Sequence, residues 1–201
     1  MTVRERAPAI AGRTSSAGRA EGYTLVEVMF VAGVIAVIMA TAVPQIGVGV
    51  DRARARAAAR YLAAQMIFAR TQAVGRSATV ALRFQRDARG ATLTAFLDGN
   101  RNGVRTRDIE SGVDRQTQAP ARLDQLFPGV TIGDPSDSVE APAQLGGTEL
   151  LSFTPAGTST SGTIQLSGRD GSRFAVRVFG VTGRVRVLRF DDRSGGWMEL
   201  F

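Results

Sequence analysis

Residues 22–43 read GYTLVEVMFVAGVIAVIMATAV, and this stretch decides the architecture of the chain. From Thr24 to Val43 there are 20 residues, and the only charged one among them is Glu27. At about 1.5 Å per residue, a helix of this length crosses a hydrocarbon core of about 30 Å. The sequence therefore predicts a transmembrane helix over residues 23–43.

The residues before this stretch predict how the helix is oriented. Residues 1–21 carry Arg4, Arg6, Arg13 and Arg19 and show no apolar periodicity, which is typical of a disordered segment. A secretory signal peptide is cut after its apolar run at an A-x-A pattern, and no convincing pattern of this kind follows Val43. The positive-inside rule then predicts a single-pass protein of an inner membrane, with a cytoplasmic N-terminus and a periplasmic remainder.

The composition restricts the classes of function. The 201 residues include no Cys and no His, so disulfides, thiolate zinc sites, Cys or His nucleophiles and imidazole bases are excluded. We therefore expect no enzyme activity and no cofactor. The formal charge is +7, and all 25 basic residues are Arg, which suits acidic lipids, nucleic acid or acidic partners.

The helix is expected to continue beyond the apolar stretch as an amphipathic helix over residues 44–75. Pro44 follows the apolar run and predicts a kink, and Gly75 predicts the C-terminal end. Leu62 and Met66 fall on a face that either meets neighbouring helices in an assembly or lies under a loop of the same domain. The stripe expected to pack on the rest of the chain consists of Val50, Ala53, Ala57, Tyr61, Ala64 and Phe68, with Arg52, Arg56 and Arg70 opposite.

Beyond Gly75 the pattern changes to the period of a β-strand. Alternation over residues 80–85, a turn at residues 87–90 and an apolar stretch at residues 93–97 predict a hairpin. Four later segments at residues 150–154, 163–166, 173–179 and 184–190 are separated by glycines and predict further antiparallel strands. The expected fold class is α+β, with one long N-terminal helix packed on an antiparallel β-sheet.

The stretch from Gly99 to Gly147 is less regular and is expected to be a surface loop region, with an acidic portion holding Asp134, Asp137 and Glu140. At its start, Asp98, Asn100 and Asn102 match the first half of a calcium loop. The second half fails, because Ile109 occupies the place of the bidentate Glu. A tight turn held by Asp and Asn side chains explains the same residues, so the metal site is a weak alternative.

A second candidate site lies at Gly183-Arg184-Val185-Arg186-Val187. Alternation in a strand places Arg184 and Arg186 on one face, roughly 6.6 Å apart, with the valines toward the core. Two guanidinium groups at this distance can contact neighbouring phosphates, and a solvated strand face accounts for the same pattern without a ligand.

The segment Gly22-Tyr23-Thr24-Leu25-Val26-Glu27 resembles the processing motif of type IV prepilins and type II secretion pseudopilins. The resemblance implies that a prepilin peptidase cuts after Gly22 and methylates the new amine of Tyr23. It also implies that Glu27 pairs with the free amine of a neighbouring subunit. A carboxylate within an apolar helix costs several kcal/mol of free energy unless it is neutralised or paired. The alternative is a polar residue tolerated at the membrane edge.

Together with the amphipathic helix, the turn at Asp98 and the Gly-Arg-x-Arg strand, this motif is similar to the GspH/FimT family of minor pilins and pseudopilins. The resemblance implies a pilin-like fold with a leader at residues 1–22, a transmembrane half-helix at 23–43, an amphipathic half-helix at 44–75 and a periplasmic β-rich domain at 76–201.

It also implies a structural subunit of a type II secretion pseudopilus or of a type IV pilus tip, with other pilins as its partners. The alternative function is that of a DNA-binding minor pilin that uses Arg184 and Arg186.

Overall fold

The computed structural model describes residues 22–87, 90–133, 143–144 and 149–200, with the backbone alone at residues 41–46, 48 and 143–144. The chain divides into two compact units, residues Met1–Ala42 and Val43–Phe201. The helix α1, Leu25–Arg76, is continuous over 52 residues and belongs to both units. Within the described part of the chain, no helix reaches the length and hydropathy needed to cross a membrane.

The second half of α1 packs on the strands with the face opposite to the one predicted. Leu62 and Met66 are 0% exposed, whereas Val50 and Phe68 are 40% and 48% exposed. The predicted packing stripe is therefore wrong, and Leu62 and Met66 are covered by their own domain. The buried face consists of Ala55, Ala58, Ala59, Leu62, Ala63, Met66, Ala69 and Ala73.

The reason is that alanines occur on both sides of this helix, so apolar periodicity supports two different stripes. Leu62 and Met66 are the large aliphatic side chains of the buried face, and the other helix residues of that face are alanines. Phe68 adds apolar area to the other face without being buried there, so the periodicity favoured the wrong stripe.

The C-terminal end of α1 lies one residue beyond the position predicted from Gly75. Ser77 takes the left-handed conformation with φ of 51°, and the N–H of Ala78 donates to the carbonyl oxygen of Ala73 at 3.3 Å. Ser77 therefore occupies the cap position that glycine most often fills, and Gly75 lies inside the helix.

The first sheet contains the predicted hairpin. β1, Val80–Asp87, pairs antiparallel with β2, Gly90–Leu97, in a register that places Val80 opposite Leu97. β7, Leu150–Phe153, pairs with the other edge of β1. The short strands β3, Arg115–Gln116, and β4, Ala121–Arg122, both pair with β2.

The remaining strands form a second antiparallel sheet, so the expectation of a single sheet is corrected to two. The strand order is β11-β10-β9-β8-β5, with β6 also pairing with β8. A sequence pattern marks strands but not their pairing, which explains the difference. These strands are β5, Val130–Ile132; β6, Ala143–Gln144; β8, Gly162–Gly168; β9, Arg173–Phe179; β10, Arg184–Asp191; and β11, Gly196–Glu199.

The region predicted as surface loop holds short elements. α2, Thr106–Glu110, and α3, Leu123–Leu126, lie there together with β3 to β6. The acidic portion with Asp134, Asp137 and Glu140 lies outside the described residues.

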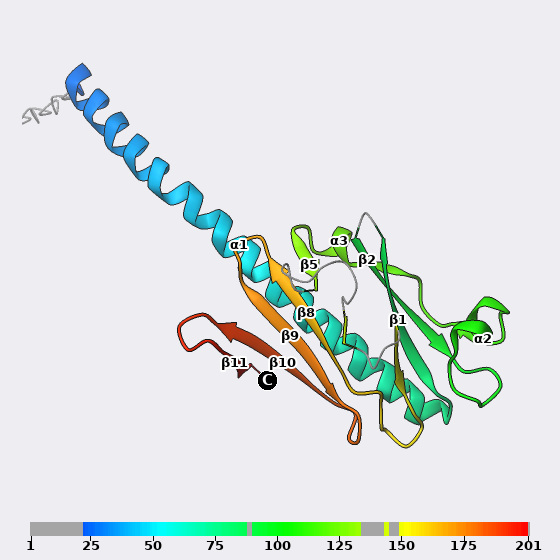
Figure 1. The fold of residues 1–201 in the computed structure, drawn as a ribbon. Helices are drawn as coiled ribbons and strands as arrows, with labels where there is room; N and C mark the ends of the chain where they lie inside the picture. Colours follow the sequence, from blue (N-terminus) through cyan, green and yellow to red (C-terminus); the bar gives the residue numbers. More distant parts are fainter. Residues whose placement is uncertain (1–21, 88–89, 134–142, 145–148, 201) are drawn as a thin grey trace, which may run out of the picture. The chain divides into compact units, whose positions relative to one another are not determined.

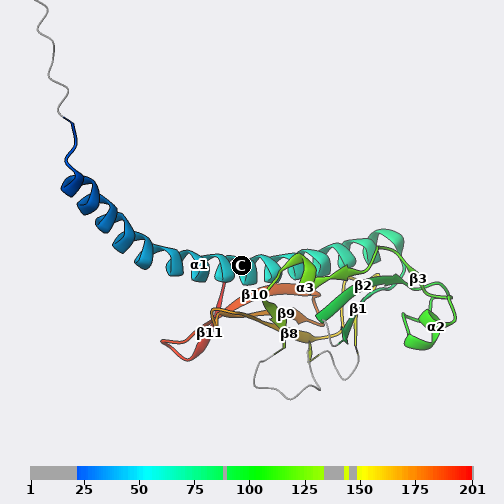
Figure 2. The ribbon, with the colours of Figure 1, turned by 90° about the horizontal axis from the view of Figure 1, so that it is seen from above.

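Both sheets lie on the same side of the second half of α1, next to one another along the helix (Figures 1 and 2). The main core joins the buried face of α1 to the inner faces of the two sheets, with Phe153 and Phe174 among the largest fully buried side chains. A smaller cluster of Ala81, Phe96, Val104 and Leu150 covers the outer face of the first sheet. The class is α+β, as predicted.

Candidate functional site

The first candidate site is the N-terminal end of α1. Gly22 and Tyr23 precede the helix and are exposed. The hydroxyl oxygen of Thr24 accepts a hydrogen bond from the N–H of Glu27 at 3.2 Å, so Thr24 caps the helix. The T-x-x-E spacing of Thr24 and Glu27 is the sequence signal of such a cap.

Glu27 lies in the first turn of α1, where the unpaired N–H groups give the helix a partial positive charge. The side chain is exposed. Glu27 is therefore accessible to groups outside the chain. Pro44 lies within α1, but its side chain and the leader at residues 1–21 are outside the described residues. The kink at Pro44 stays a prediction.

The loop after β2 folds around the carboxylate of Asp98. One oxygen of Asp98 accepts the N–H groups of Asn100 and Arg101 at 3.1 and 2.8 Å, and the other accepts the N–H of Gly103 at 2.7 Å. Asn100 Oδ1 accepts the N–H of Asn102 at 3.2 Å. These oxygens therefore hold the backbone of a tight turn.

A second buried aspartate closes the same loop. Asp114 accepts the N–H of Gly99 and the N–H of Arg105, each at 3.0 Å. The amide nitrogen of Asn102 donates to Asp108 at 3.0 Å. Within the described residues, no group of three or more His, Cys, Asp or Glu is arranged to hold a metal ion. The hydrogen bonds correspond to the turn that was the alternative to a calcium site.

The third candidate site is the face of the second sheet that carries Arg184 and Arg186. Arg184 is exposed, and its guanidinium makes no hydrogen bond or ion pair with the described residues. Arg186 donates to Glu199 at 2.8 Å and lies over the ring of Phe179, 5.2 Å from its centre. The two arginines share a face, but Glu199 already neutralises one of them in part.

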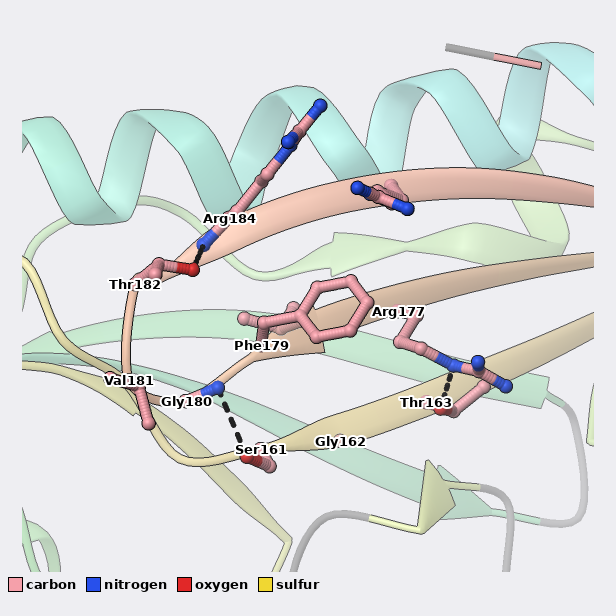
Figure 3. A pocket seen from close by; sticks show the side chains of 11 residues that line it. Ser161, Gly162, Thr163, Arg177, Phe179, Gly180, Val181, Thr182 and Arg184 are labelled. Atoms are coloured by element: carbon pink, nitrogen blue, oxygen red, sulfur yellow. Dashed lines mark hydrogen bonds between the residues drawn. The ribbon is translucent and has the colours of Figure 1, made fainter. Parts of the chain in front are cut away.

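Arg177 belongs to this surface and was missed in the sequence. The register places Arg177 opposite Arg186 and Phe179 opposite Arg184. Arg177, Phe179 and Arg184 lie around an open pocket of about 640 Å³, in which the guanidinium of Arg177 donates to Thr163 at 3.3 Å (Figure 3). Alternation within the strand at residues 173–179 gives Arg177 and Phe179 a common face, but only the register shows that Arg186 shares it.

Gly183, in the turn before Arg184, packs against the turn that contains Gly157. Its φ is +58°, and a Cβ there would collide with the carbonyl oxygen of Gly157, in the connection from β7 to β8. That oxygen accepts a hydrogen bond from Nε of Arg70 at 3.0 Å. Arg70, predicted to lie on the solvent side of α1, therefore ties the helix to the connection on which Gly183 packs.

The turn between β10 and β11 contains a carboxylate with a perturbed pKa. The hydroxyl of Ser194 donates to Asp191 at 2.8 Å and is the main reason that the pKa of Asp191 lies below its usual value of 3.8. The N–H groups of Arg193 and Ser194 and the charge of Arg189 act in the same direction, and desolvation opposes them. Asp191 therefore stays ionised over the neutral pH range.

Comparison with known proteins relates the central part of the chain to one family. The model of the family described as type II transport protein GspH matches residues 58–183, from within α1 to the turn before β10. No curated protein matches the sequence.

Among solved structures, two of the minor pseudopilin EpsH from the type II secretion system of Vibrio cholerae are similar. One is 15% identical with a TM-score of 0.45, over 68% of this chain and 97% of EpsH. The other is 14% identical with a TM-score of 0.44, over 67% of this chain and 92% of EpsH.

Proposed function

The chain belongs to the family of the type II transport protein GspH, and from this we propose that it is a minor pseudopilin or minor pilin. In this role it is a non-enzymatic structural subunit that joins a type II secretion pseudopilus or the tip of a type IV pilus through its N-terminal helix. Its partners are other pilins or pseudopilins, a prepilin peptidase and the inner membrane.

The observation that carries the proposal is the exposure of apolar side chains on the first half of α1. Val26 and Phe30 are 74% and 73% exposed, and the other large aliphatic side chains from Leu25 to Met39 are exposed as well. A contiguous apolar surface of this kind marks contact with a membrane or with other proteins. It supports an anchor that also serves as an assembly surface.

The proposed maturation follows from the residues at the start of α1. The peptidase removes residues 1–22 by cutting after Gly22 and methylates the amine of Tyr23. The half-helix at residues 23–43 then spans the membrane, Pro44 marks its exit, and residues 44–75 with the β-rich part at 76–201 lie in the periplasm. Exposure of Gly22 and Tyr23 outside the helix supports access by the peptidase.

The processing step is tested by mass spectrometry of the chain produced with and without an active prepilin peptidase. We expect a product that begins with N-methylated Tyr23, and we expect Gly22→Leu to keep its leader. A parent chain that keeps its full mass beside the active peptidase would contradict the proposed maturation.

The assembly step is tested at Glu27, whose carboxylate is proposed to receive the amine of a neighbouring subunit. Glu27→Gln keeps the size of the side chain and removes its charge, so it should be processed normally yet fail to co-purify with the other pseudopilins. Glu110→Gln, which removes an exposed charge on α2, is the matched control. Equal co-purification of both variants would remove Glu27 from the mechanism.

A second candidate function is supported by the surface of Arg177, Arg184 and Arg186 beside the half-exposed ring of Phe179. Guanidinium groups next to an aromatic face suit single-stranded nucleic acid, because arginines contact phosphates and a base stacks on the ring. This surface supports a subunit that binds incoming DNA.

DNA binding is tested with the full chain in uncharged detergent micelles and a labelled oligonucleotide at several salt concentrations. The double substitution of Arg184→Ala and Arg186→Ala should weaken binding and lower the salt slope, by roughly 0.7 for each phosphate of a single strand that is no longer neutralised. Arg107→Ala with Arg115→Ala removes two exposed charges elsewhere and should leave binding unchanged. Equal weakening in the two double variants would contradict a specific site.

A further inference from the structure

A groove of about 990 Å³ lies between α1 and the inner side of the second sheet, at the end where β10 turns toward β11. Helix residues from Gly49 to Ala64 form one wall, and Phe174, Arg189 and Leu200 form the other. It lies inside the compact unit Val43–Phe201 and shares no lining residue with the surface of Arg177 and Arg184.

The groove concentrates positive charge. Arg52, Arg56 and Arg60 follow one another at intervals of four residues along α1, about 6 Å apart along the axis. Arg189 approaches from the sheet. The described lining residues include four arginines and no Asp or Glu.

The position of Arg189 is unusual for an inner face. It pairs with Phe174 in the register of β10 and β9, and paired residues point to the same side of a sheet. Phe174 is 1% exposed, within the core. On β10, Arg189 therefore follows Val185 and Val187 on the inward-facing side of the strand. It lines the same groove as the arginines of α1.

Nearby carboxylates compensate this charge only in part. Asp170, outside the lining, accepts Nε of Arg52 at 3.3 Å, and Arg189 interacts electrostatically with Asp191. No described residue forms a hydrogen bond or ion pair with the guanidinium of Arg56. Like charges that share one groove repel one another, and an anion that contacts Arg56 and Arg189 relieves this repulsion.

We propose that this groove binds a carboxylate-bearing segment of a different subunit. This inference rests on the proposed function, because it requires a neighbour in an assembly. A second copy is disfavoured, because the chain carries a formal charge of +7, which stays positive without residues 1–22, and would bring like charge to the groove. Ala53 and Ala57 lie between the arginines and leave room for a backbone to approach, and carboxylates spaced by four residues match the arginine row.

Two other anions fit the groove less well. Arg56 lies 13 residues beyond Val43, or about 20 Å along the helix. The polar layer on each side of a bilayer is only about 5 to 8 Å thick, so headgroups at the proposed membrane edge do not reach Arg56. For nucleic acid, the exposed aromatic face needed for stacking is missing among the described lining residues, because Tyr61 is half-buried against Phe127 at 5.6 Å.

The test measures binding of a labelled helical peptide with Glu at every fourth position and Ala between, by fluorescence anisotropy. The protein is the full chain in uncharged detergent micelles. Arg56→Gln with Arg189→Gln should weaken binding about tenfold, since two partly exposed ion pairs no longer form. Arg107→Gln with Arg115→Gln removes the same charge elsewhere and should change binding less than twofold.

Several outcomes would overturn the proposal. They are no binding of the peptide, equal weakening in both double variants, or a weakening at Arg56 and Arg189 that is larger for an oligonucleotide, or for micelles that contain phosphatidylglycerol, than for the peptide. Glu27→Gln should keep full peptide binding. Loss of peptide binding to the groove can thereby be distinguished from loss of assembly through α1, because Glu27→Gln should affect assembly alone.

Discussion

The guanidinium of Arg70 joins α1 to the connection between β7 and β8, and Gly183 packs on the carbonyl oxygen that receives it. This contact explains why glycine is needed before Arg184, because a side chain there would collide with the carbonyl oxygen of Gly157. At the scale of single residues, the sequence identified Gly183, Arg184 and Arg186 as a motif. It did not show that Arg70 and Gly157 hold this motif in place, because they are distant in sequence and adjacent only in the fold.

Gly183→Ala should destabilise the protein more than Gly171→Ala. Both glycines have positive φ, which disfavours a side chain by about 1 to 2 kcal/mol. Gly171 has open space around its Cβ position, whereas a Cβ at Gly183 collides with backbone and adds about 1 to 3 kcal/mol. Urea unfolding of both variants measures the difference, and equal destabilisation would show that the two turns are not in contact.

Ser194→Ala should raise the pKa of Asp191 toward its usual value of 3.8, because the main cause of the lowered pKa is removed. A lowered pKa stabilises the fold above the pKa of the unfolded chain, and this contribution is lost as the pH falls through the folded value. A carboxyl NMR titration measures the shift. Ser111→Ala, whose hydroxyl donates to a backbone oxygen, is the control and should leave the Asp191 titration unchanged.

At the scale of elements, the sequence predicted the hairpin of β1 and β2 and the strands β7 to β10, because period-two patterns and glycine turns are local signals. The prediction failed for the buried face of α1, because that face is determined by the strands that pack against it. The buried face of α1 was assigned to Val50 and Phe68, although Leu62 and Met66 are the buried side chains. Local pattern cannot choose between two faces that both carry alanines.

The faces of α1 are tested by a pair of truncations. Leu62→Ala should destabilise the protein by about 2 to 5 kcal/mol, because Leu62 is fully buried. Ile67→Ala removes similar volume from an exposed position and should change the free energy of unfolding by less than about 0.5 kcal/mol. Equal losses in the free energy of unfolding would contradict the assignment of Leu62 to the buried face of α1.

At the scale of the whole molecule, the helix cannot be separated from the sheets. Residues 55–73 supply one wall of the main core, and the strands supply the other. The sequence predicted a β-rich domain at residues 76–201, a boundary based on the change of periodicity at Gly75. In the structure, the compact unit Val43–Phe201 contains these residues together with the second half of α1.

A chain that begins at Val43 should therefore unfold cooperatively, while a chain that begins at residue 77 should not fold. The longer piece keeps the buried face of α1, and the shorter one exposes the inner faces of both sheets, including Phe153 and Phe174. Circular dichroism with thermal unfolding distinguishes the two pieces. A cooperative transition in the shorter piece would show that the strands form a core without the helix.

The alanines on the buried face of α1 also determine which substitutions this protein can accept. Ala55, Ala58, Ala59, Ala63, Ala69 and Ala73 have no rotamers to restrict, so they order without loss of side-chain entropy. Because these alanines are buried in the main core, a larger residue at their positions overpacks it. Val50, Ile67 and Phe68 lie away from this face and are exposed, so the core places no such restriction on them. One side of the helix is thus fixed by its own fold, and the other is free to diversify as its neighbours change.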